Sequence, residues 1–288
     1  MTVPAYLLFH LNLAFSSVSA DKRPEIIAKC YWPMLNLAKD HHLPIGIELT
    51  GWTLSEIARL DPRWIETFRS LLASKHCELV GSGWSQLIGP LVPYPVNRWN
   101  QSLGLQAYLD FLGVKPSLVL VNEMAYSDSM VDVYHEAGYQ GFVMDRDNVR
   151  LALNIEDKLL SAVPTHGQGP GGAQLPVLWG DSNLFQQLQR VVHADKPVAD
   201  YLGYVKSRAQ RDGQVIPLYC NDAEVFDFRP GRFTTEAAVS GAGEWKRLRE
   251  VVCQAVQDAS LQLVLPSQAL AHSLANRSHH PKIGRAHV

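Results

Sequence analysis

The chain has 288 residues, of which 47% are hydrophobic, and these apolar residues are sufficient for one large core. Its 26 basic and 28 acidic residues give a net charge of −2 without a basic tract, which argues against nucleic acid or an anionic membrane as the partner. The four cysteines lie far apart and form neither a disulfide framework nor a zinc motif, so a reducing, cytoplasmic location is expected.

Apolar stretches of strand length alternate with stretches of helical periodicity along the chain. Strands are predicted over residues 6–10, 45–49, 77–80, 118–121, 141–144, 175–179 and 215–220. Helices are predicted over residues 24–38, 54–73, 98–112, 130–137, 184–191, 198–210 and 235–257, and a short apolar run follows at 261–265. Such alternation indicates parallel strands joined by crossover helices, hence an α/β barrel or an open α/β sheet.

Prolines and glycines mark where the predicted helices and strands are interrupted. Pro33 is expected to kink or divide the first helix, and Asp61-Pro62 to break the second. The stretch G-Q-G-P-G-G at 167–172 is predicted to be a surface loop, because it lacks the glycine spacing of a dinucleotide site. The first apolar run is read as a strand and not as a secretory signal, because no basic residue precedes it and His10 and Asn12 interrupt it.

A single barrel domain is therefore expected over residues 1–276. The tail, residues 277–288, has no apolar period and is expected to be disordered or artefactual. No apolar run approaches the ~20 residues that cross a bilayer, so no membrane partner is expected. The substrate is expected to be a neutral small molecule or polymer.

Polar residues recur at the carboxyl ends of the predicted strands, where parallel α/β proteins place their sites. They are His10, Asn12, Glu48, Glu78, Ser82, Trp84, Gln86, Asn122, Glu123, Asp145, Asp147, Trp179, Asp181, Asn221, Asp222 and Glu224. The richest clusters cover 121–128 and 219–233, and each places a carboxylate after an apolar strand. Two carboxylates from different strands are what glycoside hydrolysis requires, one to attack the sugar carbon and one to move the proton.

Simpler interpretations stand beside this one. Asn122 and Glu123 would also suit the capping of a helix that begins near Ser129. The aromatic residues near the strand ends, among them Trp84, Tyr126 and Trp179, would suit either stacking on sugar rings or packing between helices and sheet.

Four segments resemble, in order and spacing, the successive motifs of glycoside hydrolase family 57. They are F-H-L-N-L-A-F-S-S at 9–17, C-E-L-V-G-S-G-W-S-Q-L-I-G-P-L-V-P at 77–93, V-N-E-M-A-Y-S-D at 121–128 and L-Y-C-N-D-A-E-V-F-D-F-R-P-G-R-F at 218–233. The resemblance implies a (β/α)7 barrel and a retaining enzyme that hydrolyses or transfers α-linked glucans, without a metal or other cofactor.

By this resemblance, Glu123 matches the nucleophile and Asp222 the general acid/base. His10 and Glu78 match substrate-binding positions of the first two motifs. The further substrate-binding candidates are the strand-end residues Asn12, Glu48, Trp84, Gln86, Tyr126, Trp179 and Glu224. Arg229 and Arg232 are expected to hold the loop after Asp222 by pairing with Asp227 or Glu224.

The sequence also departs from the family pattern. The usual H-x-P reads His10-Leu11-Asn12, and the aromatic residue and proline that usually precede the nucleophile are absent before Glu123. The family carries a helical region after the barrel that contributes to the site, whereas little follows Leu265, so this region is expected to be truncated.

Two alternatives remain. A metal-dependent polysaccharide deacetylase has a similar barrel, but it needs an Asp and two His ligands, usually with a His-x-x-x-His pair, and no such pair occurs. A non-catalytic sugar-binding barrel is compatible with the altered motifs, although the presence of Glu123 and Asp222 argues against it.

Overall fold

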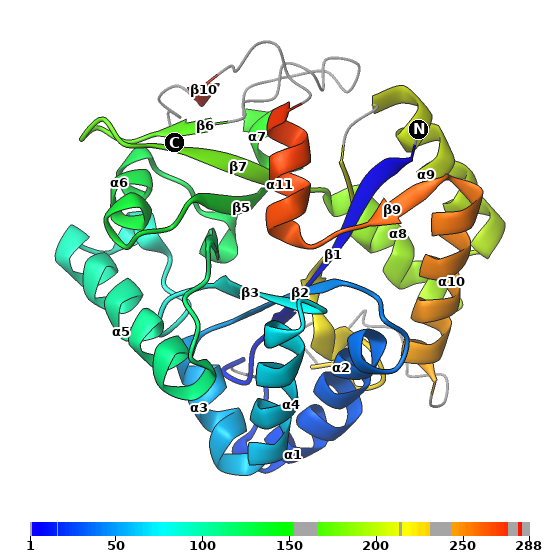
Figure 1. The fold of residues 1–288 in the computed structure, drawn as a ribbon, viewed down its shortest axis with the longest axis horizontal. Helices are drawn as coiled ribbons and strands as arrows, with labels where there is room; N and C mark the ends of the chain where they lie inside the picture. The colour runs from blue at the N-terminus through cyan, green and yellow to red at the C-terminus, as the bar shows by residue number, and fades with distance from the viewer. Residues whose placement is uncertain are drawn as a thin grey trace.

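The computed structural model describes residues 2–15, 17–152, 166–212, 215–230, 243–275 and 282–283. Strands and helices alternate through most of this part of the chain (Figure 1). The strands are β1 (Val3–Leu11), β2 (Ile45–Leu49), β3 (Cys77–Gly81), β4 (Leu118–Leu120), β5 (Gly141–Asp145), β6 (His166–Gln168), β7 (Gln174–Gly180), β8 (Ile216–Asp222), β9 (Leu261–Leu263) and β10 (Lys282–Ile283).

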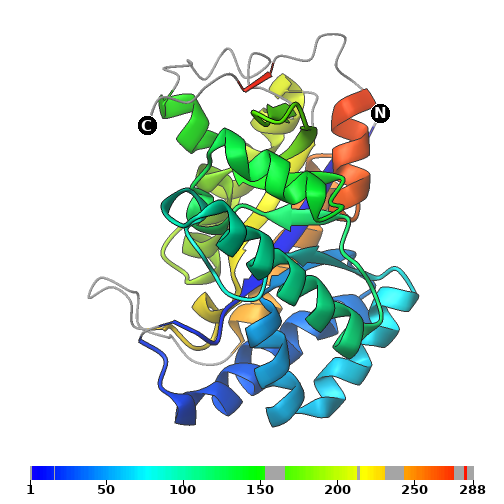
Figure 2. The same cartoon turned by 90° about the vertical axis from the view of Figure 1, so that its left-hand side faces the viewer.

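The described helices pack on the outside of the sheet, except α11 (Pro266–Ala275), which packs against β1 and β7 at one end of the sheet. They are α1 (Arg23–Ile26), α2 (Trp32–Lys39), α3 (Gly51–Leu60), α4 (Pro62–Ala73), α5 (Tyr94–Leu112), α6 (Asp128–Glu136), α7 (Arg146–Ala152), α8 (Ser182–Val192), α9 (Val198–Asp212), α10 (Glu244–Asp258) and α11 (Pro266–Ala275). Figure 2 shows α1 to α4 together at the lower end of the molecule and α11 in the upper half. No described helix is both long and apolar enough to cross a membrane.

The main sheet has the order β7-β5-β4-β3-β2-β1-β8, and all pairings within it are parallel. The predicted α/β class with parallel strands is therefore confirmed. Strand β6 pairs antiparallel with the first half of β7, β9 adds to β1, and β10 pairs with β6. Continuous apolar runs such as that of β4, whose three residues are all buried, form these strands because both faces are covered.

The two ends of this order, β7 and β8, face each other without pairing in the described strands. We call this gap the seam. Across it, the Tyr6 hydroxyl of β1 donates a 2.8 Å hydrogen bond to the carbonyl of Trp179 on β7. A Cβ added to Gly180 would lie 3.3 Å from the Cys220 sulfur, so the strand ends also approach closely.

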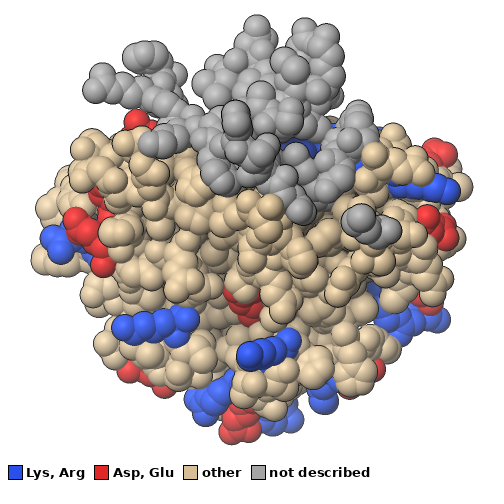
Figure 3. All heavy atoms as spheres, turned by 45° about the horizontal axis from the view of Figure 1, so that its top comes forward, with Lys and Arg blue, Asp and Glu red and all other residues tan. Residues whose placement is uncertain are grey.

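A small apolar core lies on the face of the sheet opposite the outer helices. Its members alternate along the strands and include Leu8, Leu120 and Leu178, and Leu270 of α11 joins them. Helix α11 packs against β1 and β7. The larger cores lie between the outer helices and the sheet. Charged side chains of both signs are interspersed on the face shown in Figure 3.

Most predicted boundaries agree with the structure, and the differences have local causes. Asp61-Pro62 separates α3 from α4 as predicted, whereas the first helix changes to a π-helical turn over Ile27–Tyr31, just before Pro33. Helices α7 and α11 and strand β6 were not predicted. The early part of the helix predicted at 235–257 and most of the tail lie outside the described residues, although Lys282–Ile283 forms β10.

Helix α5 lies directly on the backbone that follows β3. An added Cβ at Gly104 would lie 2.4 Å from the carbonyl carbon of Gly83, which itself has a φ of +83°. The Tyr108 hydroxyl donates to the Leu49 carbonyl at 2.7 Å and receives the Ser82 amide at 3.0 Å. These contacts seat α5 on the ends of β2 and β3.

We predict that Gly104→Ala lowers the free energy of unfolding by more than about 2 kcal/mol, because the new methyl group meets backbone that cannot yield. Gly203 of α9 is the matched control, since it is exposed and an added Cβ there meets nothing within 4 Å. Gly203→Ala should stabilise by roughly 0.5–1 kcal/mol. Urea denaturation measures the free energy of unfolding of both variants. If Gly104→Ala and Gly203→Ala change it equally, the Gly83 backbone does not restrict position 104.

Candidate active site

A cavity of about 230 Å³ opens at the carboxyl ends of the main strands. Its lining residues are His10, Phe15, Gln86, Leu120, Glu123, Met124, Asp145, Ser182, Phe185, Cys220, Asn221 and Asp222. Of the predicted site residues, the structure thus brings together His10, Gln86, Glu123 and Asp222. Strand register places His10 beside Asp222 on one side and Glu48 on the other.

Glu123 follows β4 in an unusual backbone conformation. Its φ is 52° and that of Met124 is 54°, so two successive non-glycine residues occupy the left-handed region. The preceding Asn122 is anchored, because its Nδ2 donates to the Ser82 carbonyl at 3.1 Å and its Oδ1 accepts from the Ser82 hydroxyl at 2.7 Å. Neither Asn122 nor Glu123 caps α6, whose N-cap residue is Ser127.

Asp222 is the last residue of β8 and lies above a buried aromatic layer. The Tyr219 hydroxyl donates to the Asp222 carbonyl at 2.7 Å and receives Nε2 of Gln189 at 3.1 Å. Ala223 and Phe226, which follow Asp222, are fully buried. Two buried apolar side chains thus lie close behind Asp222 in the chain.

Glu224 lies outside the cavity and is fully buried. Its Oε1 accepts the Asn12 amide at 2.7 Å and the Tyr31 hydroxyl. Burial, followed by the charge of Asp222, raises the pKa of Glu224 to about 8. Asn12 in turn donates to Oε1 of Gln86 at 2.6 Å, so Asn12 and Glu224 support the cavity wall from behind.

Glu48 is also fully buried, next to His10. Burial raises the pKa of Glu48 to about 8, with the Ser82 side chain opposing the shift and the charges of Asp222 and Glu224 adding to it. Burial lowers the pKa of His10 to about 3. The 3.9 Å between His10 Nδ1 and Glu48 Oε2 therefore joins a neutral imidazole to a neutral acid, not an ion pair.

Glu78 is not at this rim, and its predicted position was wrong. It is the second residue of β3, which continues to Gly81, so its side chain lies below the rim. There it accepts the Ser267 amide of α11 at 2.8 Å and the Ser117 hydroxyl at 3.3 Å.

Three predicted aromatic contacts also lie outside the cavity lining. Trp84 packs over Gly51, where an added Cβ would meet its ring at 2.9 Å. Tyr126 stacks on Phe142 with 5.9 Å between ring centroids, and Trp179 belongs to the outer core around β7. All three side chains thus make packing contacts with other parts of the fold.

Several lining residues were not among the predicted site residues. Asp145 and Asn221 were noted among the polar strand-end residues but not chosen as site residues; they are the last residue of β5 and the last but one of β8. Asp145 accepts the Ser182 hydroxyl at 2.7 Å. Ser182 and Phe185 enter from the first turn of α8, and their approach depends on the position of that helix, which no local pattern reveals.

Arg229 holds the loop after β8 through a partner that the sequence did not indicate. Its guanidinium donates to both carboxylate oxygens of Glu244, at 2.9 and 2.7 Å, whereas Asp227 or Glu224 had been expected as its partner. Burial alone would raise the pKa of Glu244, but Arg229 and the Asp227 amide hold it below its usual range. Arg232 lies outside the described residues.

The model of glycosyl hydrolase family 57 matches residues 9–282. The chain belongs to this family. It is 23% identical over 244 residues to an alpha-amylase of Pyrococcus horikoshii, a match that covers 84% of this chain and 36% of the amylase. The chain thus spans about a third of the length of that relative.

Solved structures share the fold of this family 57 chain. The 4-alpha-glucanotransferase from Thermococcus litoralis superposes with a TM-score of 0.75 at 19% identity, covering 96% of this chain and 41% of the transferase. A putative polysaccharide deacetylase from Mycobacterium smegmatis superposes with a TM-score of 0.65 at 18% identity, covering 100% of this chain and 95% of the deacetylase. At these identities the likeness concerns the fold alone.

We predict that Glu48→Gln makes this family 57 chain more stable than the unmodified chain, by a difference that grows as pH rises. Because the folded-state pKa of Glu48 is raised to about 8, its stabilising contribution is complete below the unfolded value near 4.5 and is lost progressively up to pH 8. Gln stays neutral throughout, so its advantage should grow from near zero at pH 4.5 to about 4 kcal/mol at pH 8.

Denaturation curves between pH 4.5 and 9 measure this difference. Glu66→Gln on α4 is the control for the loss of an exposed carboxylate. A stability difference between Glu48→Gln and the unmodified chain that does not change with pH would contradict the neutral, buried acid.

We predict that Arg229→Met lowers both stability and activity, because it leaves the buried Glu244 carboxylate unpaired beside the loop that follows Asp222. The expected loss is about 3–5 kcal/mol. Arg190→Met is the matched control, since the 2.7 Å pair of Arg190 with Asp195 is more than half exposed and worth at most about 1 kcal/mol. Thermal unfolding compares the two variants. An Arg229→Met variant as stable as Arg190→Met would refute the role of the Arg229–Glu244 pair in holding the loop.

Proposed function

We propose that this chain is the catalytic part of a retaining enzyme that hydrolyses or transfers α-linked glucans. The observation that carries the proposal is that Glu123 and Asp222, from the ends of β4 and β8, line one cavity in a family 57 chain. The names of its relatives, an alpha-amylase and 4-alpha-glucanotransferases, support α-glucans as the substrate class. We also infer that the seven parallel main strands correspond to a (β/α)7 barrel.

In the first step, the Glu123 carboxylate attacks the anomeric carbon while the Asp222 carboxylic acid gives its proton to the leaving glycosidic oxygen. The glycosidic bond breaks and a glycosyl ester forms on Glu123. In the second step, the Asp222 carboxylate takes a proton from water or a sugar hydroxyl, whose oxygen attacks the same carbon and releases Glu123. Two inversions give retention.

Other lining groups suit the recognition of a sugar. His10 is neutral and buried, so it can exchange hydrogen bonds with hydroxyl groups without adding charge. Gln86 presents its amide, which Asn12 orients. Phe15 and Phe185 offer apolar surface for the faces of a pyranose ring.

The raised pKa of Glu224 suits the cycle of Asp222. A neutral Glu224 adds no second negative charge next to Asp222 at neutral pH, so Asp222 can alternate between acid and base without strong repulsion from its neighbour. The hydroxyl of Tyr31 and the amide of Asn12 hold Glu224 in place.

Azide rescue distinguishes the two carboxyl groups. We predict that Glu123→Ala abolishes turnover and that azide restores it with an inverted glycosyl azide, because the anion fills the place of the nucleophile. Asp222→Ala should lower kcat/KM on unactivated glucans by about 10²–10⁴-fold, spare substrates with good leaving groups, and give a retained azide product. Products are assigned by NMR; exchanged stereochemistry would reverse the roles, and normal activity in both variants would place the chemistry elsewhere.

The deacetylase alternative is supported by the fold likeness to the Mycobacterium protein. Against it, the described residues include no group of three His, Cys, Asp or Glu side chains placed to hold a metal ion. We predict that EDTA leaves the cleavage of α-glucan unchanged and that no acetate is released from acetylated polysaccharide. Loss of activity in EDTA with recovery on adding zinc would favour the deacetylase.

A further inference from the structure

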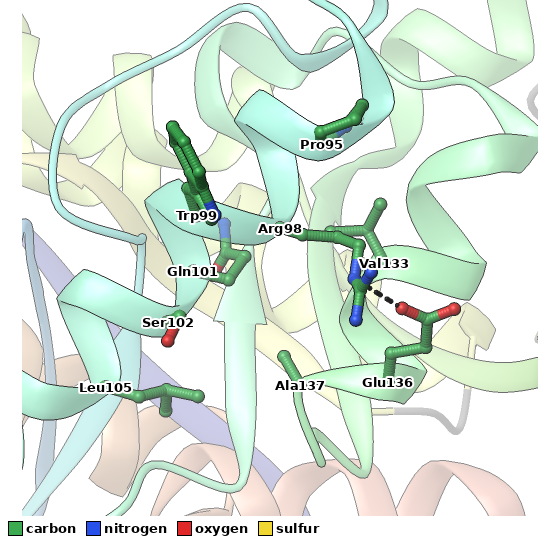
Figure 4. A pocket seen from close by; sticks show the side chains of 9 residues that line it. All are labelled: Pro95, Arg98, Trp99, Gln101, Ser102, Leu105, Val133, Glu136 and Ala137. Carbon is green, nitrogen blue, oxygen red and sulfur yellow. Dashed lines mark ion pairs between the residues drawn. The ribbon is translucent and has the colours of Figure 1, made fainter.

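A second cavity, of about 410 Å³, lies between α5 and α6, and we call it the α5–α6 groove. Its lining residues are Pro95, Arg98, Trp99, Gln101, Ser102, Leu105, Val133, Glu136 and Ala137. It shares no residue with the catalytic cavity. Figure 4 shows Trp99 on one side of the groove and the Arg98–Glu136 pair on the other.

Trp99 is the dominant feature of the groove. Its side chain is 74% exposed although it is one of the largest apolar groups in the protein. One helical turn further along α5, Leu103 is 55% exposed, so the apolar surface continues lengthwise along the helix. Exposed apolar surface bordered by polar groups marks an interaction site.

The opposite wall is polar but carries no net charge. Nε of Arg98 donates to Glu136 Oε2 at 2.8 Å, and the Tyr94 hydroxyl donates to Glu136 Oε1 at 2.7 Å. The Arg98 side chain is 59% exposed, and Ser102, on the Trp99 side of the groove, is exposed as well (Figure 4). These groups supply hydrogen bonds to hydroxyls, while the mutual neutralisation of Arg98 and Glu136 gives no preference for a charged ligand.

An aromatic wall facing neutral hydrogen-bonding groups fits one ligand class particularly well. A pyranose ring has apolar faces and a polar rim of hydroxyls, and a volume of about 410 Å³ falls within the usual range for ligand pockets. The catalytic cavity, at about 230 Å³, is below that range and holds only part of a polymer.

We propose that the α5–α6 groove binds a segment of α-glucan outside the catalytic cavity, with Trp99 stacked on a sugar ring and Arg98, Ser102 and Glu136 bonded to its hydroxyls. The proposal rests on the proposed function for the class of polymer. Two contacts on one polymer raise its effective concentration at the catalytic cavity. The groove therefore increases the turnover of polymers, which reach both sites, and not that of short oligosaccharides.

Affinity electrophoresis in gels containing glycogen tests the groove, with every variant also carrying Glu123→Gln so that the polymer stays intact. We expect Trp99→Ala to raise the Kd for glycogen about tenfold. Leu109→Ala is the control, because Leu109 is 37% exposed on the same helix but does not line the groove. With Glu123 restored, Trp99→Ala should raise KM for glycogen and leave kcat/KM for a short activated α-glucoside unchanged.

Unchanged glycogen binding by Trp99→Ala would overturn the groove proposal, while turnover of the short α-glucoside would show that the proposed function still stands. Absence of both α-glucan binding and turnover in the unmodified chain would instead refute the proposed function. Light scattering tests whether a second copy of the chain covers this surface instead. If Trp99→Ala changes the oligomeric state and not glycogen binding, the surface contacts protein and the proposal fails.

Discussion

Repulsion between like charges is the constraint on which the arrangement of the strand ends depends. Five carboxyl groups gather around the cavity: Glu48, Glu123, Asp145, Asp222 and Glu224. Burial keeps Glu48 and Glu224 neutral to about pH 8, so these two occupy the rim without adding charge. The cavity itself is lined by the other three. The surrounding protein thus determines which carboxyl groups face the substrate, since the residue types alone do not distinguish them.

The two candidate catalytic loops share a second property, which is backbone strain held by polar anchors. Glu123 and Met124 after β4, and Asp227 and Arg229 after β8, all have positive φ without being glycine. Each such residue costs about 1–3 kcal/mol, and the cost is borne only where the surroundings fix the conformation. Beside Glu123 the anchor is the reciprocal pair of Asn122 and Ser82, and after Asp222 it is the bidentate contact of Arg229 with Glu244.

The sequence predicts those features that depend only on residues close together in the chain. A proline after Asp61 had to interrupt the helical stretch, and a carboxylate directly after an apolar run, as at Glu123 and Asp222, had to lie near the end of a strand. The direction of an aromatic side chain is different, because it depends on a partner far along the chain: Trp84 packs against Gly51, and no periodicity indicates that contact. The position of α8 and the packing of α11, whose Ser267 amide donates to Glu78, are likewise set by tertiary contacts.

The seam between β7 and β8 has a mechanical consequence. Backbone ladders join the neighbouring strands of the main sheet, whereas no ladder joins β7 to β8 in the described part of the chain; side-chain packing and the hydrogen bond from Tyr6 of β1 to Trp179 of β7 span the gap. Among the described strands, the seam is therefore the line along which the main sheet lacks backbone hydrogen bonds. Glu123 follows β4, in the middle of the sheet, and Asp222 ends β8, at its border. The relative position of the two carboxyl groups therefore depends on how side chains, and not a backbone ladder, hold the β8 border beside β7.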